Sequence, residues 1–152
     1  WDNLQSKPDS PNPSGHTMLD GTVEITDLDR TEENRAFVRS FVEEILIGNQ
    51  VERLDEFVSA ERFTEHNSRL EDGLDALREE LSNNPTDRKY EKIHRLLAEG
   101  SFALCVSEGY RGDVHTSFYD LFRVAEGMIV EHWDTVEAVP PRSEWVNDNG
   151  KF

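Results

Sequence analysis

Cysteine, lysine and long apolar runs are scarce or absent in this chain of 152 residues. The single cysteine, Cys105, excludes a disulfide framework within the chain. Because Cys105 stands in the apolar run 102–106, we expect a buried, unreactive thiol, which fits a reducing cytoplasm. No run of about 18 apolar residues predicts a membrane span, and no basic and apolar N-terminal segment predicts a secretory signal. We therefore expect a cytoplasmic protein with no membrane partner.

Positive charge is also in short supply. The chain has 32 acidic residues against 16 Lys and Arg, which gives a formal net charge of −16. Because binding to phosphates needs clustered cations, we expect no nucleic-acid partner. The acidic residues are spread along the chain rather than gathered in a tail. They indicate either an ordinary solvated surface or adaptation to a high-salt cytoplasm, whose ions would screen the repulsion between them.

Motifs of several enzyme classes are missing as well. The sequence has no Gly-rich phosphate loop, nucleophile elbow, Cys-x-x-Cys pair or His-Glu-x-x-His helix. The histidines of the expected folded part are His66, His94, His115 and His132. They fall in separate predicted elements and none are spaced as a helical pair, so we expect neither a metal nor a cofactor.

Helical patterns occupy the first part of the folded region. From Thr31 apolar residues recur at helical spacing, and Gly48-Asn49 is expected to end this helix. A shorter helix is predicted over 51–58, and another over 74–81.

The second half predicts a meander of four strands. The predicted strands are 89–98, 101–110, 114–125 and 128–138. Turn residues separate them, and Pro140-Pro141 ends the last one. Helices followed by antiparallel strands are typical of an α+β domain whose helices cover one face of the sheet.

One domain is expected, because 152 residues are enough to bury a core and a cavity around a single sheet. Its expected bounds are 22–140. Residues 1–21 contain three prolines and no apolar period, so they predict a flexible or loosely docked N-terminal tail. Residues 141–152 are expected to form a C-terminal tail.

The last predicted hairpin, 118–134, places acids and a histidine among apolar residues. Alternate residues of a strand share a face, so Asp120 is expected beside Phe122, and His132 beside Asp134. Both faces are partly apolar, which predicts that the hairpin is covered on both sides. Carboxylates enclosed in this way have altered pKa values unless they are paired, and proteins make general acids and bases by this means.

Side chains from several predicted elements could meet in one pocket. The polar candidates are His66, His94, Asp120, His132 and Asp134. The aromatic candidates are Phe41, Phe57, Phe118 and Phe122. Each also has a structural explanation, such as a loop cap, a salt bridge or core packing. If a cavity exists, its apolar wall would suit an apolar or aromatic small molecule. Glu108 and Glu131 are expected at the surface.

Three stretches are similar to a known family: Phe63-Thr-Glu-His-Asn67, Phe118-Tyr-Asp-Leu-Phe-Arg-Val124 and Glu126-Gly-Met-Ile-Val-Glu-His-Trp-Asp134. They resemble SnoaL-like polyketide cyclases. These belong to the superfamily named after nuclear transport factor two, which also contains ketosteroid isomerase, scytalone dehydratase and limonene epoxide hydrolase. The resemblance covers about residues 30–140. It implies a cone-shaped fold in which N-terminal helices pack on a curved, mostly antiparallel sheet.

The resemblance also implies roles for individual residues. It places the acid/base aspartate of the cyclases at Asp134 and the hydrogen-bond-donating aspartic acid of the isomerases at Asp120. The isomerase general base falls within 65–67, where we choose His66. The isomerase tyrosine falls on Phe41, which lacks a hydroxyl, so the oxyanion-hole pair of those enzymes is incomplete. The Asp-Arg-Asp arrangement of the epoxide hydrolases is not recognisable.

We therefore predict a small-molecule enzyme that acts next to a carbonyl group by cofactor-independent acid/base chemistry, in aldol condensation, isomerisation or elimination. The predicted catalytic residues are Asp134, His66 and Asp120. The predicted substrate-binding residues are His94, His132, Phe118, Phe122, Phe41 and Asn67. The alternative is a non-catalytic module of the same fold that binds a small ligand or another protein.

The outer face of the hairpin predicts a homodimer. Its expected apolar residues are Tyr119, Leu121, Ile129 and Trp133. They point away from the expected pocket, so a monomer would expose them and a two-fold partner could cover them.

Overall fold

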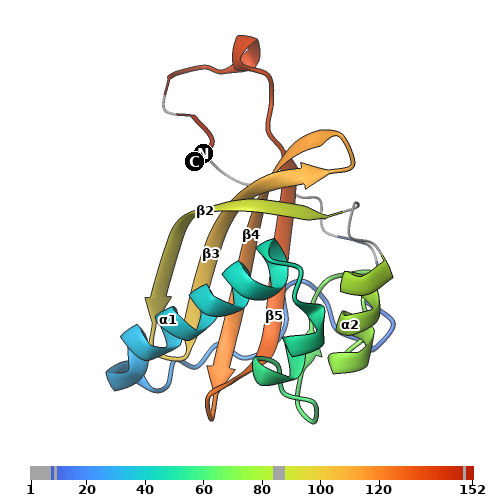
Figure 1. Ribbon diagram of the computed structural model, residues 1–152, viewed down its shortest axis with the longest axis vertical. Helices are drawn as coiled ribbons and strands as arrows, with labels where there is room; N and C mark the ends of the chain where they lie inside the picture. Colours follow the sequence, from blue (N-terminus) through green and yellow to red (C-terminus); the bar gives the residue numbers. More distant parts are fainter. Residues whose placement is uncertain (1–7, 9, 84–87, 149) are drawn as a thin grey trace.

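A computed structural model describes residues 8, 10–83, 88–148 and 150–152. In this part of the chain the helices come first and lie across one face of a curved sheet, as Figure 1 shows. The predicted α+β fold with N-terminal helices on a mostly antiparallel sheet is therefore confirmed. No helix among the described residues is long and apolar enough to cross a membrane.

Five strands form one sheet in the order β1-β5-β4-β3-β2. The strands are β1 (Thr64–Glu65), β2 (Lys89–Glu99), β3 (Phe102–Arg111), β4 (Val114–Ala125) and β5 (Met128–Ala138). β1 is parallel to β5, and the other neighbours are antiparallel. The four predicted strands are confirmed, with ends shifted by at most one residue. Register shifts within β2 help to bend it, because a bulge increases the local twist of a strand.

The predicted first helix consists of two parts. α1 (Thr31–Phe41) continues without a break into a wider π-helical segment, Val42–Ile47, in which the backbone N–H of Gly48 donates to the carbonyl of Glu43 at 3.0 Å. Asn49 follows with a φ of 56° and ends the helix as expected. The remaining helices are α2 (Leu74–Asn83) and short 3-10 turns at Leu28–Arg30, Val51–Glu56 and Arg142–Glu144.

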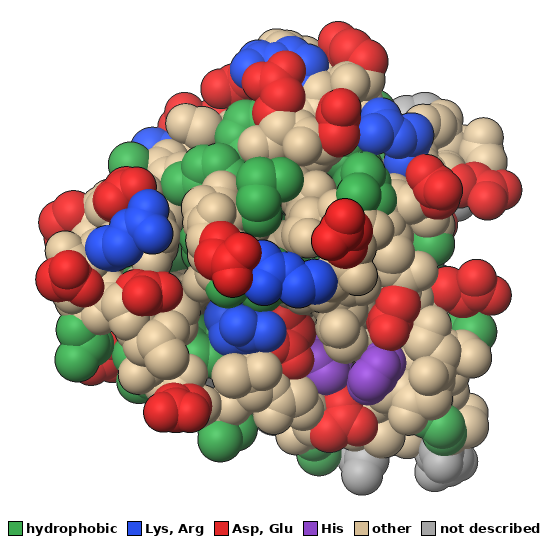
Figure 2. Space-filling model, turned by 90° about the horizontal axis from the view of Figure 1, so that it is seen from below, with side chains coloured by type: hydrophobic (Ala, Val, Ile, Leu, Met, Phe, Trp, Pro, Cys, Tyr) green, Lys and Arg blue, Asp and Glu red, His purple; other side chains and the backbone are tan. Residues whose placement is uncertain are grey.

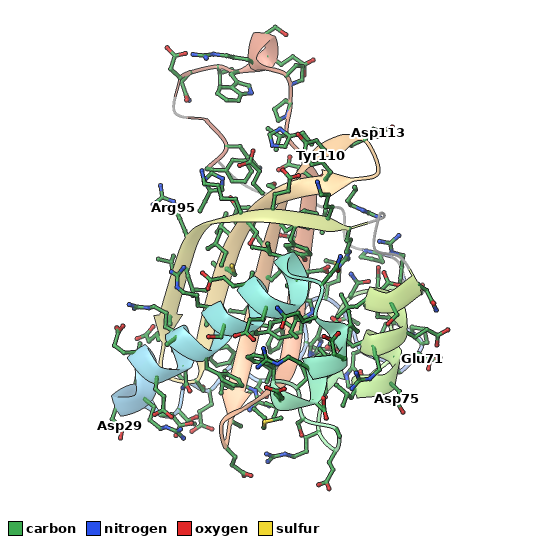
Figure 3. The ribbon with its side chains drawn as sticks, in the orientation of Figure 1. Asp29, Glu71, Asp75, Arg95, Tyr110 and Asp113 are labelled. Carbon is green, nitrogen blue, oxygen red and sulfur yellow. The ribbon has the colours of Figure 1, made fainter. Side chains whose placement is uncertain are left out.

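The core lies between the first helix and the concave face of the sheet. The helix contributes Val38, Phe41, Val42 and Ile45, each at most 2% exposed. They belong to one cluster with Ala103, Cys105, Phe122 and Val124 of the sheet. Figure 3 shows side chains filling this space. Burial of each large apolar side chain contributes roughly 1.5–3 kcal/mol. Cys105 is buried as expected, and burial raises the pKa of its thiol to about 12.

The pairing of β4 with β5 decides which hairpin residues share a face. Asp120 lies directly across from Asp134, and Phe122 across from His132, so these four face the concave side. A register shift after Arg123 then brings Ile129 opposite Val124. Ile129 is therefore fully buried in the core rather than on the outer face, where simple alternation wrongly placed it.

The outer face of the sheet is partly covered by the chain's own N-terminal segment, residues 10–22. Asn12 is 4% exposed, and its Nδ2 donates to the Glu65 carbonyl at 2.7 Å. Trp133 Nε1 donates to the Asp20 carbonyl at 2.8 Å. Of the two predicted forms, a flexible tail and a loosely docked one, these hydrogen bonds agree with docking; residues 1–7 and 9 of the expected tail lie outside the described residues.

The C-terminal segment also contacts the sheet. Phe152 stacks on His94 with ring centroids 4.2 Å apart, and Lys151 pairs with Glu137. The bounds 22–140 given to the domain stay a prediction.

Candidate active site

A cavity opens between α2, the π-helical segment and the concave face of the sheet. Its lining residues are Phe41, Leu46, Val58, Phe63, Glu65, Leu70, Leu77, Glu80, Leu81, Arg88, Tyr90, Asp120, Phe122, Ile129 and His132. Most of the wall is apolar, and a few ionisable groups lie among the apolar side chains. This combination is typical of small-molecule sites.

His132 connects two carboxylates within the cavity. Its Nδ1 lies 2.9 Å from Glu65 Oε2, and its Nε2 lies 3.2 Å from Asp120 Oδ1. Burial alone would lower the pKa of His132, but the charges of Glu65 and Asp120 outweigh it and raise the pKa to about 10. His132 is therefore an imidazolium at neutral pH, and both ring nitrogens donate a hydrogen bond.

Glu65 is fixed by the backbone as well. Its Oε1 accepts from the N–H groups of His66 and Asn67, at 3.0 and 2.9 Å. These amides follow the short strand β1, which pairs with β5 through Glu65 and His132. The same backbone pairing therefore sets the side-chain pair Glu65–His132 at the wall of the cavity.

Asp134 lies in a second buried group next to the first. Asn67 Nδ2 donates to both of its carboxylate oxygens, at 3.0 and 2.8 Å, and Arg88 Nη2 donates to Oδ2 at 2.7 Å. Burial would raise the pKa of Asp134, but the charges of Arg88 and His132 hold it below its usual value. Asp134 is therefore ionised, and both of its oxygens are already occupied.

Two buried polar atoms of this cavity stand out because they have no hydrogen-bond partner among the described residues. One is Oδ2 of Asp120, whose Oδ1 already accepts from His132 and from the Tyr90 hydroxyl at 3.1 Å. The other is Nε of Arg88. Leaving such atoms unpaired costs about 1–3 kcal/mol each. An acceptor and a donor are thus available to a ligand in the same cavity.

No protein-family model and no curated protein sequence matches this chain. Solved structures do match. A nuclear transport factor two-like protein of unknown function from Mesorhizobium loti has a TM-score of 0.62 and 18% identity, and the match covers 76% of this chain and all of that one. The chain has the nuclear transport factor two-like fold.

Two further solved structures that match this chain are named after activities. One is a candidate ketosteroid isomerase of Kribbella flavida, with a TM-score of 0.62 and 22% identity over 78% of this chain and 90% of that one. The other is an LEH-like epoxide hydrolase of M. tuberculosis, with a TM-score of 0.55 and 20% identity over 70% and 84%. At these identities the likeness is one of fold.

Three sequence-predicted site residues lie elsewhere in the nuclear transport factor two-like cone. His66 points to the outer face, where it stacks on Trp133 with ring centroids 4.5 Å apart. His94 Nε2 lies 2.7 Å from Glu108 Oε2, and His94 is outside the cavity lining. Phe118 is fully buried and stacks on Tyr90 with ring centroids 4.3 Å apart. In strand geometry His66 must face away from Glu65 and Asn67, so the expected meeting of His66 with Asp120 and Asp134 is wrong.

The other predicted residues are brought together. Asp120, His132, Phe41 and Phe122 line the cavity, while Asp134 and Asn67 form the buried group beside it. Two residues of the cavity, Arg88 and Tyr90, are not among those predicted from the sequence. Tyr90 could have been found from its place on the concave face of a predicted strand, whereas Arg88 precedes that strand and has no local signal. Glu131, expected at the surface, is 4% exposed and pairs with Arg123.

Proposed function

We propose that the protein is an enzyme that transfers a proton next to a carbonyl group of an apolar or aromatic small molecule. The observation that carries the proposal is the pair of unpartnered atoms, Asp120 Oδ2 and Arg88 Nε, in one apolar cavity. A proton acceptor and a hydrogen-bond donor are what enolate formation requires.

In the proposed step the substrate carbonyl accepts a hydrogen bond from Arg88 Nε. Asp120 Oδ2 takes the proton from the adjacent carbon, the electron pair of the broken C–H bond forms the C=C bond of the enolate, and the C=O π pair moves onto the carbonyl oxygen. The enolate then takes the proton back from Asp120 at another carbon, attacks a second carbonyl whose oxygen takes that proton, or expels a leaving group that takes it. These outcomes correspond to isomerisation, aldol condensation and elimination.

The roles of the two aspartates therefore differ from those that the sequence suggests. Asp134 holds Arg88 in place and keeps it charged, while Asp120 has the oxygen that can receive a proton without losing a hydrogen bond. His132 and Tyr90 orient Asp120 through its other oxygen. Removal of a general base of this kind lowers the rate by about 10² to 10⁴.

The first test follows proton exchange. A panel of aromatic ketones is incubated with the protein in heavy water, and loss of the signal from hydrogens next to the carbonyl is followed by NMR. We expect exchange with the wild type and a loss of about 10² to 10⁴ in Asp120→Asn. Asp113→Asn, the same change in an exposed turn at the far end of the sheet (Figure 3), is the matched control.

Three results would contradict the proposal. Full exchange by Asp120→Asn would exclude Asp120 as the general base. Loss of exchange in Asp134→Asn alone would favour Asp134, the acid/base residue predicted from the sequence. Ketones that bind to the wild type without any exchange would favour the alternative, a ligand-binding module. Circular dichroism of each variant verifies that it is folded.

Epoxide hydrolysis is a second candidate. Arg88 pairs with Asp134, and Asp120 is close enough that its charge also raises the pKa of Arg88. The three residues form an aspartate–arginine–aspartate group that is not recognisable in the sequence. The resemblance associates such a group with epoxide hydrolases. Diol formation from an epoxide panel, with no exchange on the ketones, would favour this function over the first.

A further inference from the structure

A second group of ionisable side chains lies outside the cavity, where the N-terminal segment crosses the sheet. His16 and Asp20 come from that segment, and His66 follows β1. One ligand atom from each lies within 4.8 Å of the others. Two histidines and a carboxylate from parts of the chain about 50 residues apart thus meet at one point.

The two ring nitrogens of His66 have different surroundings. Nε2 lies 3.0 Å from Oε1 of Glu131, a buried carboxylate that Arg123 also holds at 2.6 Å. Nδ1 lies 2.9 Å from both the Thr17 carbonyl and Asp20 Oδ1. Histidines that bind metals usually donate the other N–H to a carboxylate, which turns the lone pair of the free nitrogen toward the ion. In the tautomer whose Nε2–H donates to Glu131, the lone pair of His66 Nδ1 would face the Thr17 carbonyl and Asp20 Oδ1.

The other two members are oriented from outside the group as well. His16 Nε2 lies 3.1 Å from Asp72 Oδ2, so a carboxylate also holds this ring. Asp20 uses Oδ2 to accept the backbone N–H of Thr17 at 2.9 Å, which leaves Oδ1 on the side of His66. His66 is 1% exposed, so this point is enclosed by protein on the side of the sheet.

We propose that His16, Asp20 and His66 form a site for a divalent transition-metal ion of the Zn²⁺ type. Two imidazoles and one carboxylate suit this class, whereas Mg²⁺ and Ca²⁺ prefer oxygen ligands alone. The Thr17 carbonyl is close enough to His66 to supply a fourth ligand. The ion would fasten the N-terminal segment to the sheet, and it plays no part in the reaction proposed for the cavity.

The test uses the full chain after treatment with a chelator. Titration calorimetry with Zn²⁺ should show one ion per chain, and Co²⁺ should give the visible absorption of a low-coordinate site. We expect at least a ten-fold loss of Zn²⁺ affinity in His16→Ala and in Asp20→Asn, since loss of an outer partner alone costs about 10- to 100-fold. His115→Ala, which removes a histidine that bonds to Glu108 elsewhere, should bind like the wild type.

Unchanged Zn²⁺ affinity in both site variants would overturn the proposal, as would a wild type that binds no Zn²⁺. The second result would mean that hydrogen bonds alone hold the cluster together. A melting temperature that rises with Zn²⁺ in the wild type and in His115→Ala, but not in His16→Ala or Asp20→Asn, would support the fastening role.

Discussion

Asp120 and Asp134 are neighbours in the sheet, but the hydrogen bonds to their carboxylates differ. They face each other across β4 and β5, and both are at least 96% buried. Asp134 has a cation and an amide on its oxygens, whereas one oxygen of Asp120 is free of partners among the described residues. This difference is the reason that we propose Asp120 as the proton acceptor, since a fully bonded, ionised carboxylate is a poor one.

The buried His132 predicts a specific pH dependence of stability. Its pKa is raised from an ordinary 6.5 to about 10 in the folded protein, so its stabilising effect is complete below about pH 6.5 and is lost as the pH rises through about 10. We expect the free energy of unfolding, measured by urea denaturation, to fall across this range. Each unit of pKa difference corresponds to about 1.4 kcal/mol.

His132→Gln is the comparison for this measurement, because glutamine cannot gain the charge. Its unfolding free energy should be lower at neutral pH and should decline less steeply toward about pH 10. An equal decline in the variant and the wild type would show that other groups cause the pH dependence.

At this scale the sequence predicts the identity of candidates better than their contacts. Asp120 and His132 could be placed in one cavity because strand alternation and a tight turn determine their faces. The face on which His66 lies could not be predicted, because β1 has only two residues and a one-residue shift reverses every side chain. The place of Arg88 in the cavity could not be predicted either, because it depends on contact with Asp134, 46 residues away.

Among the elements, the N-terminal segment, which was expected to be flexible or loosely docked, passes very close to the sheet. Gly21 has a φ of 112°, and a Cβ there would lie 2.5 Å from Glu131 Oε1 and 2.5 Å from Trp133 Cζ2. The segment can pass this close to the sheet because position 21 has no side chain. Composition alone does not reveal such contacts, since three prolines are compatible with both a loose and a docked segment.

Gly21→Ala should therefore release the segment from the sheet. Overpacking of this kind costs about 1–3 kcal/mol, so we expect a lower free energy of unfolding and faster hydrogen exchange in residues 12–22. Gly15→Ala is the matched control, because Gly15 also has a positive φ, 95°, but nothing lies within 4 Å of its added Cβ. Equal effects of the two changes would show that backbone strain, rather than the close approach, dominates.

The strands were predictable to within a residue because turn residues and alternation mark them clearly. The shift in strand pairing after Arg123 could not be predicted, since bulges have no reliable sequence signal here. This shift places Ile129 in the core. The homodimer prediction rested partly on Ile129. With that residue buried and residues 10–22 lying over part of the outer face, the dimer stays a prediction for sedimentation to test.

For the whole molecule, the net charge of −16 is the dominant property. Acidic side chains are scattered over the face seen in Figure 2 rather than gathered into one patch. If this surface is adapted to high salt, the melting temperature should rise between low and molar KCl, because ions screen the repulsion between acids. A melting temperature that stays constant or falls would favour an ordinary solvated surface.

We propose that the cavity binds a carbonyl substrate between Asp120 and Arg88. A crystal structure with a naphthol, whose hydroxyl imitates the oxygen of an enol, would test this binding mode. We expect this oxygen within hydrogen-bond distance of both Asp120 Oδ2 and Arg88 Nε, with the rings against the apolar wall. A naphthol bound elsewhere, or bound with its oxygen turned away from Asp120, would contradict it.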